Sequence, residues 1–185
     1  MKAEQLRINP TRLMDRLNRL AEIGATPDGS CCRLALTDED KAGRDLVVGW
    51  MRELGLEVRV DPIGNIFGLR RGTESIETCA PVMTGSHIDT VRTGGRYDGN
   101  LGVLGGLEVV QTLNDAGITT RRPLVVGAFT DEEGARYKFY MRKYAEAVKA
   151  QPAAYARTVV RGAKAFSDFW IFRGPGRFGV VLLGF

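Results

Sequence analysis

The sequence is poor in the residues that most often identify a metal or disulfide site. It has a single histidine, His87, and three cysteines, at positions 31, 32 and 79, in a chain of 185 residues. The cysteines are odd in number and form no CxxC pair, which argues against a disulfide framework and against a cysteine-rich zinc site. We therefore expect reduced thiols.

Long apolar segments are also missing. No run approaches the ~20 apolar residues of a membrane-spanning helix, and the first ten residues contain no apolar segment of the kind found in secretory signals. These absences predict a cytoplasmic protein without a membrane partner.

The charge is distributed unevenly along a chain of otherwise ordinary globular composition, with 44% hydrophobic and 26% charged residues. Residues 1–137 carry 17 basic and 20 acidic side chains, whereas residues 138–185 carry nine basic and two acidic ones. Ten of the fifteen aromatic residues also lie in the second segment. We therefore divide the chain into residues 1–137, one domain in size, and a basic, aromatic-rich tail of residues 138–185.

The first segment has clear signals for helices and strands. Apolar residues at helical spacing, bounded by capping residues and glycines, predict three helices. Short apolar or alternating runs predict four strands, the first two joined as a hairpin by the turn at 61–65. The predicted helices span residues 10–23, 37–54 and 100–116, and the predicted strands span residues 56–60, 66–69, 81–84 and 123–129.

Polar residues follow the last two predicted strands. A strand, a helix and a second strand in this order favour a parallel crossover, and active sites of open α/β sheets form at the carboxyl edge of such strands. This arrangement is expected to bring His87 and Asp98 close to Glu132 and Glu133, although 45 positions separate the first from the last.

These residue types suit a metal site. Imidazole nitrogen and carboxylate oxygen are zinc ligands. Asp89 lies two residues after His87, where its carboxylate is expected to accept the second N–H of the imidazole and orient the ring. Asp98 follows a glycine-rich loop that can bend back over the metal, and its two oxygens could bridge two ions.

Glu132 and Glu133 are expected to do different jobs. Adjacent side chains of an extended segment point in opposite directions, so one glutamate would bind metal and the other would act as a general base. Each signal alone has an ordinary structural explanation: a structural histidine, an Asp-Gly turn or a solvated acidic pair. Their joint placement at two strand ends is what favours a metal site over these explanations.

Two stretches then point to a known family. "GSHIDTVRTGGRYDGNLGVLGGLEVVQTLNDAGI" followed by "FTDEEGARY" strongly resembles the N-carbamoyl-L-amino-acid hydrolases. These enzymes belong with β-ureidopropionases and allantoate amidohydrolases in the two-metal amidohydrolase/aminopeptidase superfamily. Upstream segments such as "DPIGNIFG" agree as well, so the resemblance covers residues 7–137.

The resemblance implies an α/β fold: part of a three-layer α/β/α catalytic domain of the zinc aminopeptidase type, truncated before the lid or dimerisation domain. It makes His87 a ligand of one metal, Asp98 the bridging ligand, Glu133 a ligand of the other metal, Glu132 the general base, and Asp89 the acid that orients the histidine. The implied cofactor is Zn²⁺, two per site, with Mn²⁺, Co²⁺ or Ni²⁺ as alternatives.

The implied reaction is metal-assisted hydrolysis of an amide or ureido C–N bond in a small N-carbamoyl amino acid, by a protein that forms homodimers in the family. The sequence departs from the family after Tyr137: no later histidine completes the metal site, and residues 138–185 do not match. The alternative is therefore a catalytically inactive, truncated fragment whose tail comes from a shifted reading frame or a foreign segment. A third reading, a module whose basic tail binds nucleic acid, is not favoured, and no nucleic-acid partner is expected.

Overall fold

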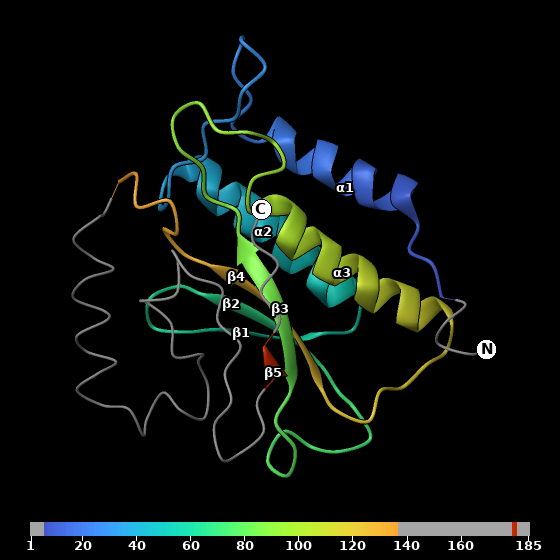
Figure 1. The fold of residues 1–185 in the computed structure, drawn as a ribbon. Coiled ribbons are helices and arrows are strands. Elements are labelled where there is room, and N and C mark those ends of the chain that lie inside the picture. The colour runs from blue at the N-terminus through green and yellow to red at the C-terminus, as the bar shows by residue number, and fades with distance from the viewer. Residues whose placement is uncertain (1–5, 137–178, 181–185) are drawn as a thin grey trace.

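A mixed sheet forms the centre of the chain, as Figure 1 shows. The computed structural model describes residues 6–136 and 179–180; the predicted tail from residue 138 otherwise lies outside this range, as does the boundary at 137/138. The described helices are α1 (Pro10–Glu22), α2 (Asp38–Glu53) and α3 (Asn100–Asp115), and the strands are β1 (Glu57–Val60), β2 (Ile66–Arg70), β3 (Val82–His87), β4 (Leu124–Phe129) and β5 (Gly179–Val180).

The strands lie in the order β1-β2-β4-β3-β5. The predicted hairpin is confirmed, because β1 pairs with β2 in antiparallel register. Strand β4 pairs antiparallel with β2 on one side and parallel with β3 on the other. The parallel pair joined by α3 was also predicted, and the α/β fold class is confirmed.

Strand β3 is longer than predicted, since it continues past Gly85 to His87. Gly85 is paired with Gly127 of β4, and a Cβ atom at Gly85 would lie 2.3 Å from the carbonyl oxygen of Gly127. Glycine is therefore needed here for close approach of two strands and does not end the strand. As a result His87 is the last strand residue, opposite Phe129.

The helices begin where capping residues predict. The side chain of Asn9 accepts the backbone N–H of Arg12 at the start of α1, and Pro10 occupies the first turn. The side chain of Thr37 accepts the N–H of Asp40 at the start of α2. These bonds satisfy amide groups that have no partner within the helix. No helix among the described residues is both long and apolar enough to cross a membrane.

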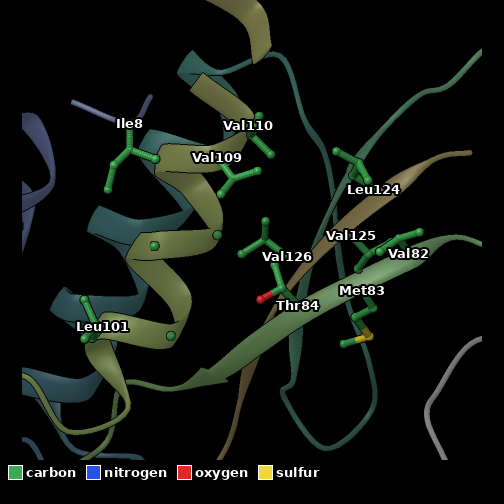
Figure 2. Close-up of a pocket in the computed structure, with 13 residues that line it drawn as sticks. Ile8, Val82, Met83, Thr84, Leu101, Val109, Val110, Leu124, Val125 and Val126 are labelled. Atoms are coloured by element: carbon green, nitrogen blue, oxygen red, sulfur yellow. The ribbon is translucent and has the colours of Figure 1, made fainter. Parts of the chain in front are cut away.

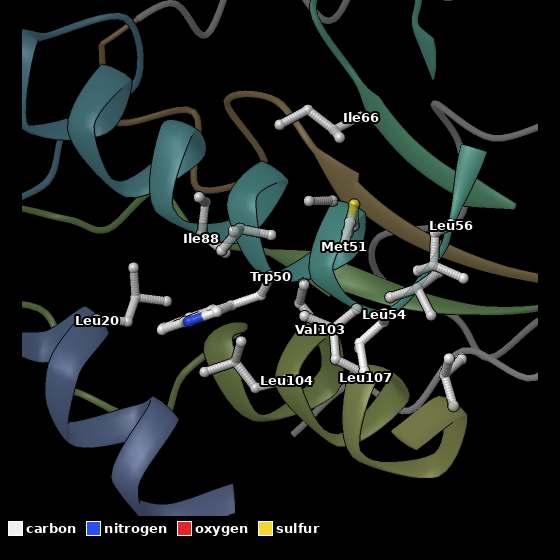
Figure 3. Close-up of a cluster of buried hydrophobic side chains, with 14 of the residues drawn as sticks. Leu20, Trp50, Met51, Leu54, Leu56, Ile66, Ile88, Val103, Leu104 and Leu107 are labelled. Atoms are coloured by element: carbon white, nitrogen blue, oxygen red, sulfur yellow. The ribbon is translucent and has the colours of Figure 1, made fainter. Parts of the chain in front are cut away.

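One hydrophobic core joins all three helices to one face of the sheet (Figure 3). Trp50 of α2 lies between Leu20 of α1 and Leu104 of α3 in this core. The strands contribute the side chains of Ile66, Val126 and Ala128.

The other face of the sheet carries a smaller cluster around Phe67, Met83 and Val125. The described residues therefore form two layers of the expected three-layer domain, with α1, α2 and α3 in one of them. A helix layer on the second face is not among these residues.

A buried carboxylate fastens α1 to α3. The Glu108 side chain is fully buried and accepts hydrogen bonds from the backbone N–H of Asn9 at 2.9 Å and from Arg12 Nε and Nη2 at 2.8 and 2.7 Å. Arg16 Nη1 lies 3.6 Å from its second oxygen. Burial alone would raise the pKa of Glu108, but the bonds from Arg12 and Asn9 and the Arg12 charge outweigh it and lower the pKa.

An apolar hollow of about 380 Å³ lies between α3 and strands β3 and β4 (Figure 2). None of its lining residues is ionisable, and its only side-chain hydroxyl belongs to Thr84. Because it lacks groups that could bind metal or transfer a proton, this hollow is not the candidate site.

Replacing Glu108 should destabilise the fold strongly. Glu108→Gln removes the buried negative charge that accepts hydrogen bonds from Arg12. Arg12 is partly exposed and keeps its ion pair with Asp115, so we expect a loss of about 2 kcal/mol in the free energy of unfolding, the scale of hydrogen bonds to a charged group. Urea unfolding of the full chain measures it. The control is Asp45→Asn, which breaks an exposed ion pair with Lys41 and should cost nothing measurable. Equal effects of the two substitutions would contradict the role assigned to Glu108.

The Glu108 contribution should also depend on pH. Because the folded-state pKa of Glu108 is lowered, its stabilising effect is fully present above the unfolded-state pKa of about 4.3 and is lost as the pH falls through the folded-state value. The difference in unfolding free energy between wild type and Glu108→Gln should therefore shrink below about pH 4. If the difference in unfolding free energy between wild type and Glu108→Gln stays constant from pH 7 to pH 3, the predicted pH dependence is wrong.

Candidate metal centre

The candidate site lies at the carboxyl ends of β3 and β4. The parallel register pairs His87 with Phe129, so the segments that follow the two strands leave the sheet side by side. After β4 the chain bends: Asp131 has a positive φ of 57°, and the N–H of Gly134 donates to the carbonyl oxygen of Asp131. This bend turns Glu132 and Glu133 back toward β3.

His87 is held in one orientation. Its ring is buried, and Nδ1 lies 2.9 Å from the backbone carbonyl oxygen of Asp89. A carbonyl oxygen can only accept, so Nδ1 carries the proton in this bond. A neutral ring then presents the lone pair of Nε2 on its other side, as a metal-binding histidine must.

Carboxylates lie near the Nε2 edge of that ring. His87 Nε2 lies 3.3 Å from an oxygen of Glu132 and 3.9 Å from an oxygen of Asp98. His87, Asp98 and Glu133 each offer one potential ligand atom, and these three atoms lie within 4.8 Å of one another. The structure thus brings together all four residues expected at the two strand ends.

The expected contact of Asp89 is wrong in one respect. The second N–H of the imidazole is accepted by the backbone carbonyl of Asp89, while its carboxylate oxygen is 3.9 Å from Nδ1. The carboxylate accepts instead the backbone N–H groups of Glu132 and Glu133, each at 3.3 Å. Asp89 therefore links the end of β3 to the segment after β4. Its backbone carbonyl orients His87, and its carboxylate holds the backbone of Glu132 and Glu133.

The expected geometry of the two glutamates is also wrong. An extended segment would send Glu132 and Glu133 to opposite sides, yet both approach the His87 ring. The reason is that residues 130–133 form a bend, in which Asp131 has a positive φ, and not the extended segment that the alternation requires.

The acids of the site have altered proton affinities. Burial raises the pKa of Glu132, and the neighbouring carboxylates of Glu133, Asp89 and Asp98 add to this, while His87 in its protonated form opposes it. Burial likewise raises the pKa of Asp89, to about 6, against the lowering effect of His87 and of the two backbone N–H groups. Neighbouring acids whose pKa values are raised by burial are typical of metal and catalytic sites.

Gly99 makes room for the histidine. Its φ is +64°, and a Cβ atom there would lie 2.5 Å from the Cε1 and Nε2 atoms of His87. Gly99 thus lets the start of α3, and with it Asp98, approach the ring edge.

These donors fit a divalent metal ion. One imidazole nitrogen and two carboxylate oxygens are a ligand set that zinc accepts, and three protein ligands leave a coordination position for water or substrate. The described residues offer one such group of three.

Comparison with known proteins agrees with the resemblance noted in the sequence. A family model described as Peptidase family M20/M25/M40 matches residues 83–169, on both sides of the boundary predicted at 137/138. The N-carbamoyl-L-amino acid amidohydrolase of Geobacillus stearothermophilus is 49% identical over 134 residues, 72% of this chain and 32% of that protein. The corresponding enzyme of Rhizobium meliloti is 45% identical over 89% of this chain and 39% of that protein.

Solved structures give the same relationship. A hydantoinase/carbamoylase family amidase from Burkholderia ambifaria is 45% identical with a TM-score of 0.72, over 88% of this chain and 42% of that one. The chain is thus similar to N-carbamoyl-L-amino acid amidohydrolases and to hydantoinase/carbamoylase family amidases. More distant relatives include an allantoate amidohydrolase of Bacillus subtilis, 38% identical over 68% of this chain and 30% of that protein. The chain spans only 32% and 39% of the two amidohydrolases named above.

Two groups of supporting residues were not found from the sequence. One group contacts Thr130, just before Glu132 and Glu133: Asn65 accepts the backbone N–H of Thr130 at 2.9 Å, and Arg44 donates to the Thr130 hydroxyl at 3.0 Å. The sequence "DPIGN" predicts only a turn. Its last residue, Asn65, nevertheless accepts a hydrogen bond from Thr130, the residue that follows β4. The other group centres on Arg33, which no sequence pattern singled out.

Filling the space at Gly99 should damage the metal site. We expect Gly99→Ala to weaken zinc binding by about tenfold or more, because its Cβ atom would displace the His87 ring. Isothermal titration of the full chain with Zn²⁺ measures the change. Gly49→Ala is the control, because a Cβ atom at Gly49 has no neighbour within 4 Å. Unchanged affinity in a folded Gly99→Ala chain would refute this reading of the site.

Proposed function

We propose that this chain is a zinc-dependent hydrolase of ureido C–N bonds, with N-carbamoyl-L-amino acids as its substrates. The observation that carries the proposal is the group formed by His87, Asp98 and Glu133, with the carboxylate of Glu132 beside it. The names of the relatives supply the substrate class: two of them are N-carbamoyl amino acid amidohydrolases at 49% and 45% identity.

In this proposal His87, Asp98 and Glu133 hold the metal. A bound zinc ion supplies Lewis acidity toward the substrate carbonyl and lowers the pKa of water. Asp98 would be the ligand shared with a second ion, as the family resemblance implies; more than half of its side chain is exposed, and one of its oxygens lies 3.9 Å from His87 Nε2.

Glu132 is the proposed general base. Burial raises its pKa above that of a free glutamate, the direction that suits a group that must accept a proton from water and later donate it to the leaving nitrogen. Its carboxylate lies 3.3 Å from His87 Nε2, and its backbone N–H is held by Asp89. The base is therefore fixed beside the ligands without needing to be one of them.

Two substitutions should separate the two roles. His87→Ala should abolish zinc binding, because it removes the only imidazole of the chain. Glu132→Gln should retain zinc and lower the rate of hydrolysis by about 100-fold or more, since it removes the proton acceptor. Equilibrium dialysis gives the zinc content, and release of ammonia from an N-carbamoyl-L-amino acid gives the rate.

The outcome also decides the alternative. If the wild-type chain binds zinc but releases no ammonia, the alternative holds: the chain is a catalytically inactive, truncated fragment. A wild-type chain that binds no zinc would overturn the metal site itself. The exposed Glu22 provides a control, because Glu22→Gln should alter neither zinc content nor rate.

A further inference from the structure

Arg33 is a fully buried arginine in the segment between α1 and α2. All the hydrogen bonds of its guanidinium group go to uncharged acceptors. It donates to the carbonyl oxygens of Ile88, Leu20 and Ile23, to the Cys31 sulfur and to the side-chain oxygen of Asn100, at 2.7 to 3.2 Å. Burying a charge without an ionic partner in hydrogen-bond contact is costly, so these bonds must offset that cost.

Two of the acceptors border the candidate metal ligands. Ile88, which accepts from Arg33 Nε at 2.7 Å, is the residue after His87. Asn100, which accepts from Arg33 Nη2 at 3.1 Å, begins α3 two residues after Asp98. One rigid guanidinium group therefore joins the end of β3 to the start of α3.

The backbone around Arg33 holds the same region. Its N–H donates to the Thr90 hydroxyl at 2.7 Å, and its carbonyl accepts the Thr90 N–H at 2.9 Å. Two residues earlier, Cys31 exchanges both backbone hydrogen bonds with Gly94 at 2.9 Å. The loop between His87 and Asp98 is thus held at Thr90 and Gly94 by residues 31–33.

Helix α2 leaves space for this arrangement. A Cβ atom at Gly43 would lie 2.8 Å from Cδ of Arg33. The absence of a side chain at Gly43 lets the aliphatic part of Arg33 pack directly against α2. The helix therefore also restricts the position of Arg33.

We propose that Arg33 is a positioning residue that sets the distance between His87 and Asp98, and so the metal affinity of the site. This inference rests on the metal site of the proposed function. Arginine suits the task because its N–H groups point outward from a planar fork. Lysine keeps the charge but has donors on a single nitrogen, which cannot reach acceptors that three guanidinium nitrogens contact.

The test compares Arg33→Met and Arg33→Lys with the wild-type full chain. Both substitutions should lower zinc affinity by about 10- to 100-fold, the range found for residues that orient metal ligands. Arg70→Met is the matched control: Arg70 donates to Asn114 and to the carbonyl of Ile118 at the opposite end of α3. It should leave zinc affinity unchanged, although it too breaks bonds between elements.

A second readout needs no metal. His87 is the only histidine, so its Cε1–H signal is identified at once in the NMR spectrum of histidine-labelled chain. We expect one narrow signal in the wild type and in Arg70→Met, and a broadened or split signal in both Arg33 variants. This result would stand even if the wild type bound no zinc, in which case the proposed function would fail and the positioning role would not.

Gly43→Ala covers the case in which the Arg33 variants do not fold. It favours the helical state of α2 while its Cβ atom displaces the Arg33 stem, so zinc affinity and the His87 signal should change in the same direction. Gly49→Ala in the same helix is its control. Wild-type affinity together with an unaltered His87 signal in a folded Arg33 or Gly43 variant would overturn the proposal.

Discussion

The parallel pairing of β3 with β4 is the constraint on which the rest of the site depends. Its register sets His87 opposite Phe129, so residues that are distant in sequence leave the sheet at one edge. The close approach of Gly85 and Gly127 permits this register. A slip of one residue would move every side chain of β3 to the other face of the sheet, and the histidine would no longer face the acids that follow β4.

Several supports act on the two segments that leave this edge. The Asp89 carboxylate takes the backbone N–H groups of Glu132 and Glu133, and Arg33 ties Ile88 to Asn100. Fixed backbone groups therefore do most of the orienting, while the acids near His87 remain available. This division reduces the rearrangement that metal binding would require, which is the usual benefit of a preorganised site.

The parts of the fold that could be predicted from the sequence are those governed by local signals. Asn9 and Thr37 cap helices as their residue types suggest, and the alternation in 57–60 gives a strand. The convergence of His87 with Glu133 could also be predicted, because it follows from strand-helix-strand topology. What could not be predicted depends on local backbone geometry, such as the bend at residues 130–133 with its left-handed Asp131, which leaves both glutamates near His87. Arg33 was missed for a related reason: its partners are mostly backbone carbonyls, which leave no trace in the sequence.

The attachment of α1 has a consequence for the order of folding. Its contacts with Glu108 span 96 to 99 positions of sequence, and such distant contacts form late because the intervening chain must first be closed into a loop. During synthesis at about 5–20 residues per second, α1 would wait roughly 5–20 s for α3 to be made. An isolated helix of 13 residues is marginal in water. The amino-terminal helix is therefore expected to dock only after α3 has formed, and its apolar face to stay exposed until then.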